Sequence, residues 1–214
     1  MRTVVSLLAA VMAAGCTPPP PPPAPAPPPP PLPAAVWTAA ADLVVQSGTR
    51  PVLLPHPFTR LEVVAPGQSA GSLRVRCEVC TETLAGEVAR SGVIHRPASP
   101  AVAAGGSLAG FVLAVREAAS RRDIDGLGRV MSKEFVYSLS GGEGVETALA
   151  AWERERYRRL DRLPFLLDRG VARVDGSELW AAPPEFVEGL GYTGLRAGFR
   201  REGGRWVWLF LVGG

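Results

Sequence analysis

The chain has 214 residues, of which 47% are hydrophobic and 20% are charged, so it contains enough apolar residues to form a core. Its formal net charge is only +3, and Lys133 is the only lysine among basic residues that are otherwise all arginines. The sequence has no nucleic-acid-binding motif and no concentrated basic face, which argues against a nucleic-acid partner. We therefore expect one or two compact domains of ordinary globular composition.

Residues 1–16 have the three parts of a secretory signal. Arg2 is followed by an uncharged apolar run, and small residues precede Cys16. The run is shorter than the roughly 18 residues that a membrane-spanning helix needs. Its end, Ala13-Ala14-Gly15-Cys16, resembles the lipobox of bacterial lipoproteins. That resemblance implies that Cys16 is acylated and anchors an exported protein to a membrane of the cell envelope.

A proline-rich tract follows at residues 17–33. Proline lacks an N–H group and fixes φ, so the tract is expected to form polyproline II. At about 3.1 Å per residue it would reach roughly 50 Å. We interpret residues 17–48 as a spacer, with 34–48 either extending it or forming a short helix or strand. A ligand for a proline-recognition domain is the alternative interpretation of the tract.

Residues 49–97 alternate short apolar segments with Pro and Gly turns, which predicts a small β barrel. Strands are expected at residues 51–54, 60–64, 73–79, 86–90 and 92–95. The segments Arg60–Val64 and Gly86-Glu87-Val88 resemble strands of bacterial Src-homology-3-like domains, with Glu87 at the family's Trp position. The resemblance implies a binding or spacing module, with a cell-wall peptide or an envelope protein as partner. A barrel that only packs against its neighbour is the alternative.

Cys77 and Cys80 are the two cysteines that remain when Cys16 is assigned to lipid. An even number of cysteines outside the cytoplasm favours a disulfide. Free thiols, a redox pair and a zinc site are the alternatives. A redox pair needs a helix start after the motif, whereas an alternating strand pattern precedes it and no helix pattern follows. Zinc would need two further ligands, and the only histidines are His56 and His95.

Residues 107–214 combine helix patterns with later strands, which predicts an α+β domain. Ser107 is a helix N-cap ahead of an apolar face that ends at Ala119. Asp123 caps a second, short helix, and a further helix is expected from Val145. Residues 98–106 form a small-residue linker that marks the domain boundary.

The last third of the chain predicts strands. Asp175-Gly176 is a hairpin signal between two short strands. The apolar run at residues 206–212 predicts a strand covered on both faces.

This element order resembles the cone-shaped fold of nuclear transport factor 2-like proteins, which include the SnoaL-like group. The segments that carry the resemblance include Arg122–Leu127 and the strand Gly-Arg-Trp-Val-Trp-Leu at residues 204–209. It implies a curved antiparallel sheet around a pocket. The expected fold class is therefore α+β, with a small β barrel followed by an α+β domain. That fold serves enzymes and binding proteins alike, so it does not fix a function.

Aromatic residues of the second domain would either line such a pocket or form its core. They are Tyr137, Trp152, Trp180, Phe199, Trp206 and Trp208. Four polar residues could act there as acid or base, namely Tyr137, Glu143, Asp168 and Glu178. Both histidines lie in the first domain, away from any nucleophile of the second, so we expect no catalytic residue, metal ion or cofactor.

A helical stripe of three arginines, Arg154, Arg158 and Arg162, would meet anionic lipid or wall polymer. Intervening acidic residues favour a solvated, salt-bridged face instead. Together these observations predict a non-catalytic envelope lipoprotein with a binding or scaffold role through its two small domains. The alternative is a pocket enzyme or small-molecule binder of SnoaL-like type in residues 107–214.

Overall fold

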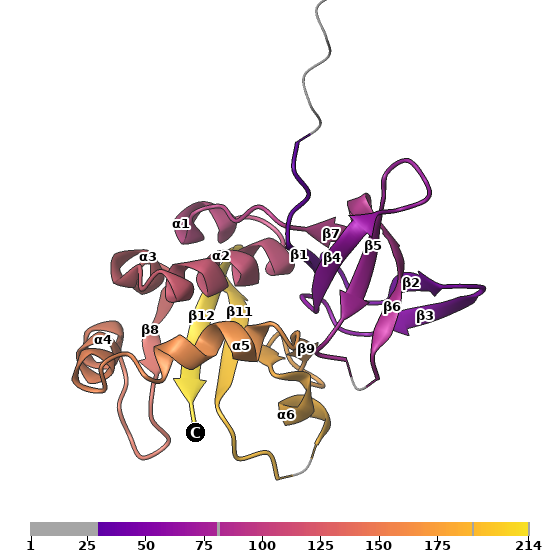
Figure 1. Ribbon diagram of the computed structural model, residues 1–214. Helices are drawn as coiled ribbons and strands as arrows, with labels where there is room; N and C mark the ends of the chain where they lie inside the picture. Colours follow the sequence, from indigo (N-terminus) through magenta and orange to yellow (C-terminus); the bar gives the residue numbers. More distant parts are fainter. Residues whose placement is uncertain (1–29, 81, 190, 214) are drawn as a thin grey trace, which may run out of the picture. The chain divides into compact units, whose positions relative to one another are not determined.

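The computed structural model describes residues 30–80, 82–189 and 191–213, and residues 32–214 belong to one compact unit (Figure 1). The signal segment, Cys16 and residues 17–29 of the spacer lie outside the described residues. The fold class is α+β, with two sheets and six α-helices in the described part of the chain.

The first sheet has seven strands in the order β3-β2-β6-β5-β4-β1-β7. Its strands are β1 (Ala35–Thr38), β2 (Leu43–Ser47), β3 (Arg50–Leu54), β4 (Arg60–Pro66), β5 (Ser72–Cys77), β6 (Leu84–Ala89) and β7 (Val93–Ile94). A 3-10 turn, η1 (Arg90–Gly92), separates β6 from β7.

The folded body begins before Thr49, the residue at which the sequence placed its start. Residues assigned to the spacer range 17–48 form β1 and β2, so the strand alternative is the one observed for this part. β1 is an interior strand, since it pairs with both β4 and β7. Val36 and Val45 are fully buried, and this apolar burial is the reason why the chain enters the sheet soon after the prolines end.

The pairings among the described residues leave the first sheet open, with β3 and β7 as its two edges, so the expected closed barrel is not seen. β2 reaches β6 through the register pair Gln46↔Glu87. Gly86 allows this approach because a Cβ there would collide with the Gln46 carbonyl oxygen and lie 2.7 Å from Val45 Cγ1. The absence of a side chain at Gly86 thus allows β2 and β6 to pair.

The second half of the unit contains the helices and a five-stranded sheet in the order β8-β12-β11-β10-β9. The helices are α1 (Pro100–Ala103), α2 (Leu108–Ser120), α3 (Ile124–Gly128), α4 (Val145–Arg154), α5 (Leu163–Leu167) and α6 (Pro184–Glu188), with a 3-10 turn η2 (Leu160–Arg162) before α5. The strands are β8 (Met131–Val136), β9 (Ala172–Arg173), β10 (Trp180–Ala182), β11 (Arg196–Glu202) and β12 (Arg205–Val212).

The N-caps predicted from sequence are confirmed. The Ser107 side chain accepts a hydrogen bond from Gly110 N at the start of α2, and the Asp123 side chain accepts one from Gly126 N at the start of α3. Both satisfy backbone donors that a helix start leaves without partners. The predicted linker at residues 98–106 contains the short helix α1.

β12 is an interior strand of the second sheet, with β8 and β11 as its neighbours. It pairs antiparallel with β11 and parallel with β8, so this sheet is mixed and not fully antiparallel. In Figure 1, α2 and α5 lie across the face of β11 and β12. Phe111 of α2 meets Phe199 of β11 edge to face, with ring centroids 6.0 Å apart, so the core lies between helices and sheet.

Candidate functional site

Asp168, at the end of α5, connects the first sheet to helix α2 through its side chain. It is 7% exposed, and its Oδ1 accepts hydrogen bonds from Trp37 Nε1 at 2.9 Å and Arg116 Nε at 2.6 Å. Arg116 Nη2 donates to Oδ2 at 2.9 Å. Arg60 Nε lies 3.9 Å from Oδ2, and the Arg60 backbone N–H donates to the Asp168 carbonyl at 3.0 Å. The carboxylate is thereby shared by β1, β4 and α2.

Arg116 is held by more than this carboxylate. Its guanidinium lies 4.8 Å from the centre of the Trp37 ring, and its Nη1 lies 2.5 Å from Glu117 Oε1. Burial lowers the pKa of Arg116, but hydrogen bonds and charges from Asp168 and Glu117 outweigh it, so the pKa is raised above its usual value. Arg116 is therefore a permanent cation, and we assign this cluster a structural role at the junction.

A groove of about 510 Å³ lies beside this junction, between the β3 edge of the first sheet and α6. We call it the junction groove. It is lined by Arg50, Val52, Leu53, Leu54, Pro55, His56, Thr59, Val79, Cys80, Glu82, Thr83, Leu84, Arg169, Pro184, Glu185 and Glu188. Its volume is in the range of ligand sites, which tend to form at such boundaries between two structural parts.

Four polar side chains of the junction groove occur as two pairs. Arg169 Nη2 lies 2.5 Å from Glu185 Oε1, and His56 Nε2 lies 3.0 Å from Glu188 Oε1. Leu53 lines the same groove and is 55% exposed. The groove therefore offers apolar surface next to fixed polar groups, which suits binding of a peptide-like ligand.

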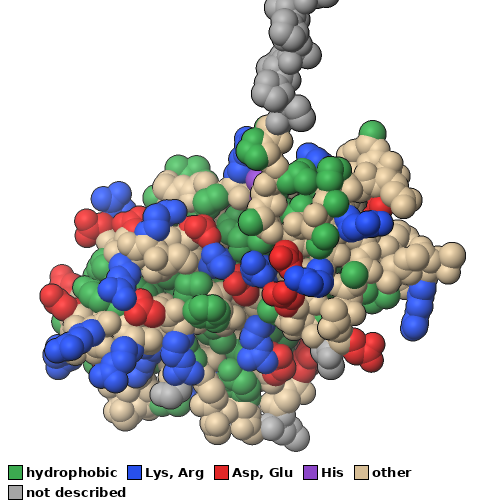
Figure 2. Space-filling view, viewed as in Figure 1, with side chains coloured by type: hydrophobic (Ala, Val, Ile, Leu, Met, Phe, Trp, Pro, Cys, Tyr) green, Lys and Arg blue, Asp and Glu red, His purple; other side chains and the backbone are tan. Residues whose placement is uncertain are grey.

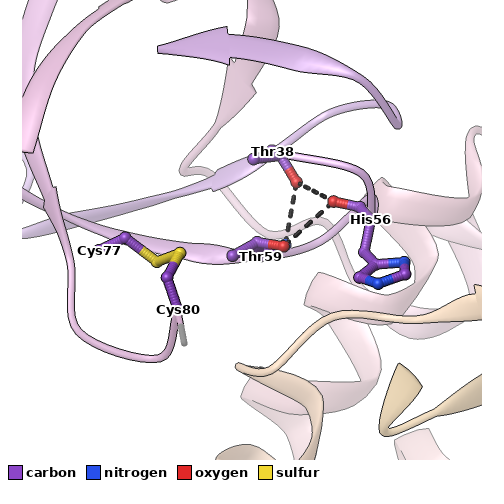
Figure 3. Close-up of a disulfide and its surroundings, with 5 residues drawn as sticks. All are labelled: Thr38, His56, Thr59, Cys77 and Cys80. Carbon is purple, nitrogen blue, oxygen red and sulfur yellow. Dashed lines mark hydrogen bonds between the residues drawn. A yellow bond between two sulfur atoms is a disulfide. The ribbon is translucent and has the colours of Figure 1, made fainter. Parts of the chain in front are cut away.

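Two threonines fix the loop that carries His56, as Figure 3 shows. The His56 carbonyl accepts hydrogen bonds from Thr38 Oγ1 and from Thr59 Oγ1, each at 3.1 Å. The Thr59 backbone N–H donates to Thr38 Oγ1 at 2.9 Å. Thr38 and Thr59 are both buried, so the wall of the groove at His56 is hydrogen-bonded to buried hydroxyl groups.

Cys77 and Cys80 are joined by a disulfide, with an S–S distance of 2.02 Å (Figure 3). Cys77 is fully buried at the end of β5, and Cys80 lines the junction groove. The bond thus ties one wall of the groove to the core of the first sheet. His95, which the zinc alternative would have needed, does not line the groove.

A second groove, of about 880 Å³, lies on the first sheet and is lined mainly by small residues of β6 and of the β4–β5 turn. Glu87 lies in it, at the position where the Src-homology-3-like resemblance has Trp. Its carboxylate accepts hydrogen bonds from Gln68 N at 2.9 Å and Ser72 Oγ at 3.1 Å. Glu87 is therefore engaged in holding the neighbouring turn.

The aromatic residues predicted to line a pocket are not gathered around one cavity. Trp152, Phe199 and Trp208 are fully buried, and the Trp152 and Trp208 rings stack with centroids 5.5 Å apart. Phe135 packs edge to face on both tryptophans. These rings lie in the core, which is one of the two interpretations of the sequence, because aromatic side chains gain most by close mutual packing.

The other three pocket candidates, Tyr137, Trp180 and Trp206, are half-buried and pack on the edge of that core. Among the acid or base candidates, Asp168 is committed to the Arg116 cluster. Glu178 forms an exposed salt bridge with Arg173 at 2.9 Å. None of these positions forms an acid–base pair with another in the described residues.

The three arginines predicted to share a stripe fall on different elements. Arg154 ends α4, Arg158 follows it, and Arg162 belongs to η2. Arg154 and Arg158 bond to backbone carbonyls of Ala150 and Glu155. Figure 2 shows basic and acidic side chains mixed over the α4 end of this face.

The junction cluster was not found from sequence. Trp37 and Asp168 are 131 positions apart, and Arg116 and Asp168 are 52 apart. The one available signal was an aspartate directly after the apolar segment 163–167, where a buried charge requires a partner.

Among the described residues, no cluster of three or more His, Cys, Asp or Glu side chains could hold a metal ion. No helix in this part of the chain combines the length and the apolar character needed to span a membrane. Comparison with protein families, with curated proteins and with solved structures found no significant match to the chain.

Proposed function

We propose that this protein is an exported, lipid-anchored envelope protein that acts by binding, without catalysis. The signal-like segment and Cys16 support the location, and the proline tract supports a spacer between the membrane and the folded body. The observation that carries the binding role is the junction groove, in which exposed apolar surface adjoins salt-bridged polar groups on a rigid frame.

We also propose the two finer fold assignments. The close approach of β2 to β6 at Gly86 supports a sharply bent, Src-homology-3-like first sheet. The helix layer packed on the second sheet supports a curved, nuclear transport factor 2-like arrangement. A core filled by tryptophans favours a partner-binding role for the second half over an enzyme pocket.

The ligand that fits the junction groove best is an extended peptide, such as a cell-wall peptide or a segment of an envelope protein. Its apolar side chains would cover Leu53 and Val79, which are 55% and 39% exposed. Its charged ends would meet the polar groups at Arg169 and Glu188. Mixed recognition of this kind needs no metal ion and no nucleophile.

The anchor is tested with Cys16→Ser in a bacterial host supplied with labelled fatty acid. The parent chain should carry the label and sediment with membranes. The variant should carry no label and leave the membrane fraction. Labelling of the variant at the parent level would rule out Cys16 as the lipid site.

The groove is tested by titrating residues 30–214 with soluble cell-wall peptides and following the binding by calorimetry. Leu53→Asp should weaken binding at least tenfold, because it places a charge in the apolar part of the groove. Val64→Asp is the matched control: Val64 is 58% exposed on the same sheet but does not line the groove. Equal affinities for both variants would exclude the groove as the site.

A further inference from the structure

The start of β12 carries a second surface, distinct from the junction groove. It surrounds a shallow cavity of about 640 Å³ between β8, the β11–β12 turn and the end of α1. We call it the α1–β12 surface. Its basic residues are Arg129, Lys133, Arg200, Arg201 and Arg205, and its carboxylates are Glu134 and Glu202.

Most of the basic side chains of this surface form no salt bridge with a carboxylate among the described residues. Arg200 pairs with Glu202 at 2.5 Å. Arg205 Nη2 donates to the Ala101 carbonyl at 2.9 Å, and Arg201 Nη2 donates to the Gly106 carbonyl at 2.9 Å. Both guanidiniums are thus positioned by backbone oxygens and keep their charge. In the described residues no carboxylate forms a salt bridge with Lys133, the one lysine of the sequence.

Two apolar side chains project beside these cations. Val102 of α1 is 73% exposed. Trp206 is half-buried, with its Nε1 donating to the Gly106 carbonyl at 3.1 Å and the Arg201 guanidinium 5.2 Å from its ring centre. An apolar tip surrounded by basic residues, with a tryptophan at the boundary, suits contact with a bilayer interface.

We infer that the α1–β12 surface docks on a membrane that contains anionic phospholipids. The five basic residues would meet headgroup phosphates, and Val102 and Trp206 would enter the interface between headgroups and acyl chains.

The inference extends the proposed anchoring, so its test uses protein without Cys16. Residues 32–214 form one compact unit that includes both cores, and residues 30–214 therefore serve as the soluble body. Binding is measured by co-sedimentation with vesicles of phosphatidylcholine containing about one third phosphatidylglycerol. Because no lipid is attached, this result does not depend on the outcome for Cys16→Ser.

The charge test compares two double variants. Lys133→Gln with Arg205→Gln should lower vesicle affinity about 25-fold, since each basic residue near an anionic surface contributes about fivefold. Arg154→Gln with Arg158→Gln is the control. It removes two exposed arginines near α4 that, like Arg205, are bonded to backbone carbonyls. It should change affinity less than twofold.

The apolar test compares two single variants. Val102→Asp should weaken binding at least tenfold, because a carboxylate would face anionic headgroups. Phe165→Asp, at a side chain that is 76% exposed on α5, should leave binding within twofold of the parent. Melting temperatures of all variants establish that they are folded.

Three results would overturn the inference. Equal losses in the two double variants would mean that net charge alone drives binding. Equal binding to pure phosphatidylcholine vesicles would exclude the basic residues as the basis of recognition. Binding to an anionic wall polymer without binding to vesicles would assign this surface to a different partner. In parallel, Leu53→Asp should leave vesicle binding unchanged, which separates this surface from the junction groove.

Discussion

Replacing Asp168 by Ala should be among the most destabilising single changes in this protein. The substitution removes the two-point carboxylate partner of the buried Arg116 guanidinium, which then has only Glu117, and it removes the acceptor of Trp37 Nε1–H. Breaking a buried ion pair by removing one partner costs about 3–5 kcal/mol of unfolding free energy. We expect a loss of about 4 kcal/mol.

The molecule contains a matched control for this measurement. Arg122 contacts Asp161 in the same two-point geometry, with Nε–Oδ1 at 3.0 Å and Nη2–Oδ2 at 2.9 Å. The side chains of that pair are 53% and 41% exposed, whereas those of Arg116 and Asp168 are 16% and 10% exposed. Asp161→Ala should therefore cost about 0.2–1 kcal/mol, because water solvates the remaining charge.

The assay is equilibrium urea unfolding of residues 30–214, checked by thermal melts. In a body of this size, about 4 kcal/mol corresponds to a fall in Tm of roughly 10 °C. The raised pKa of Arg116 contributes stability that is fully present below the pKa of the unfolded chain and is lost only as pH rises through the higher pKa of the folded protein. The contribution of Arg116 to the deficit should thus not vary between about pH 6 and 9. Equal costs for the two variants would refute the argument from burial.

Three further changes test other features. Arg156 follows α4 in the left-handed conformation of a C-terminal cap, with a φ of 54°. Arg156→Gly should therefore raise the free energy of unfolding in urea by about 1 kcal/mol. Arg154→Gly, within α4, should lower it by a similar amount. Gly86→Ala should lower the free energy of unfolding by about 1–3 kcal/mol in the same assay, because the added Cβ meets the Gln46 carbonyl oxygen. Gly105→Ala, whose Cβ would lie 3.8 Å from its nearest neighbour, should be near neutral. Equal effects of the two substitutions would count against the close approach of β2 to β6 at Gly86. The disulfide closes a loop of only four residues, so its reduction should lower the free energy of unfolding by about 2 kcal/mol. An unchanged urea midpoint in the presence of reductant would contradict this.

Local patterns were predictable from the sequence because they depend on neighbouring residues. Ser107 and Asp123 cap helices through backbone groups three positions away, and residues 206–212 are apolar enough to require cover on both faces. The start of the body was set too late, because the strands that contain Val36 and Val45 are short and acquire their partners from segments later in the chain.

The candidate sites depend on long-range contacts that sequence spacing does not encode. The junction groove combines β3 with α6, more than 100 positions apart, and neither segment has a motif. The tryptophans were identified correctly as a group of interest, but composition does not distinguish a ring that lines a cavity from one that fills it. Their stacking distances decide that question.

The interior position of β1 has a mechanical consequence. It pairs with β4 on one side and with β7 on the other, and its Trp37 is hydrogen-bonded to Asp168 at the end of α5. A pull on the segment before Ala35 is therefore resisted by two strands and by a buried side-chain bond at the same time. An edge strand in this place would peel away one hydrogen bond after another. The proposed point of attachment thus leads directly into a strand that is hydrogen-bonded on both sides.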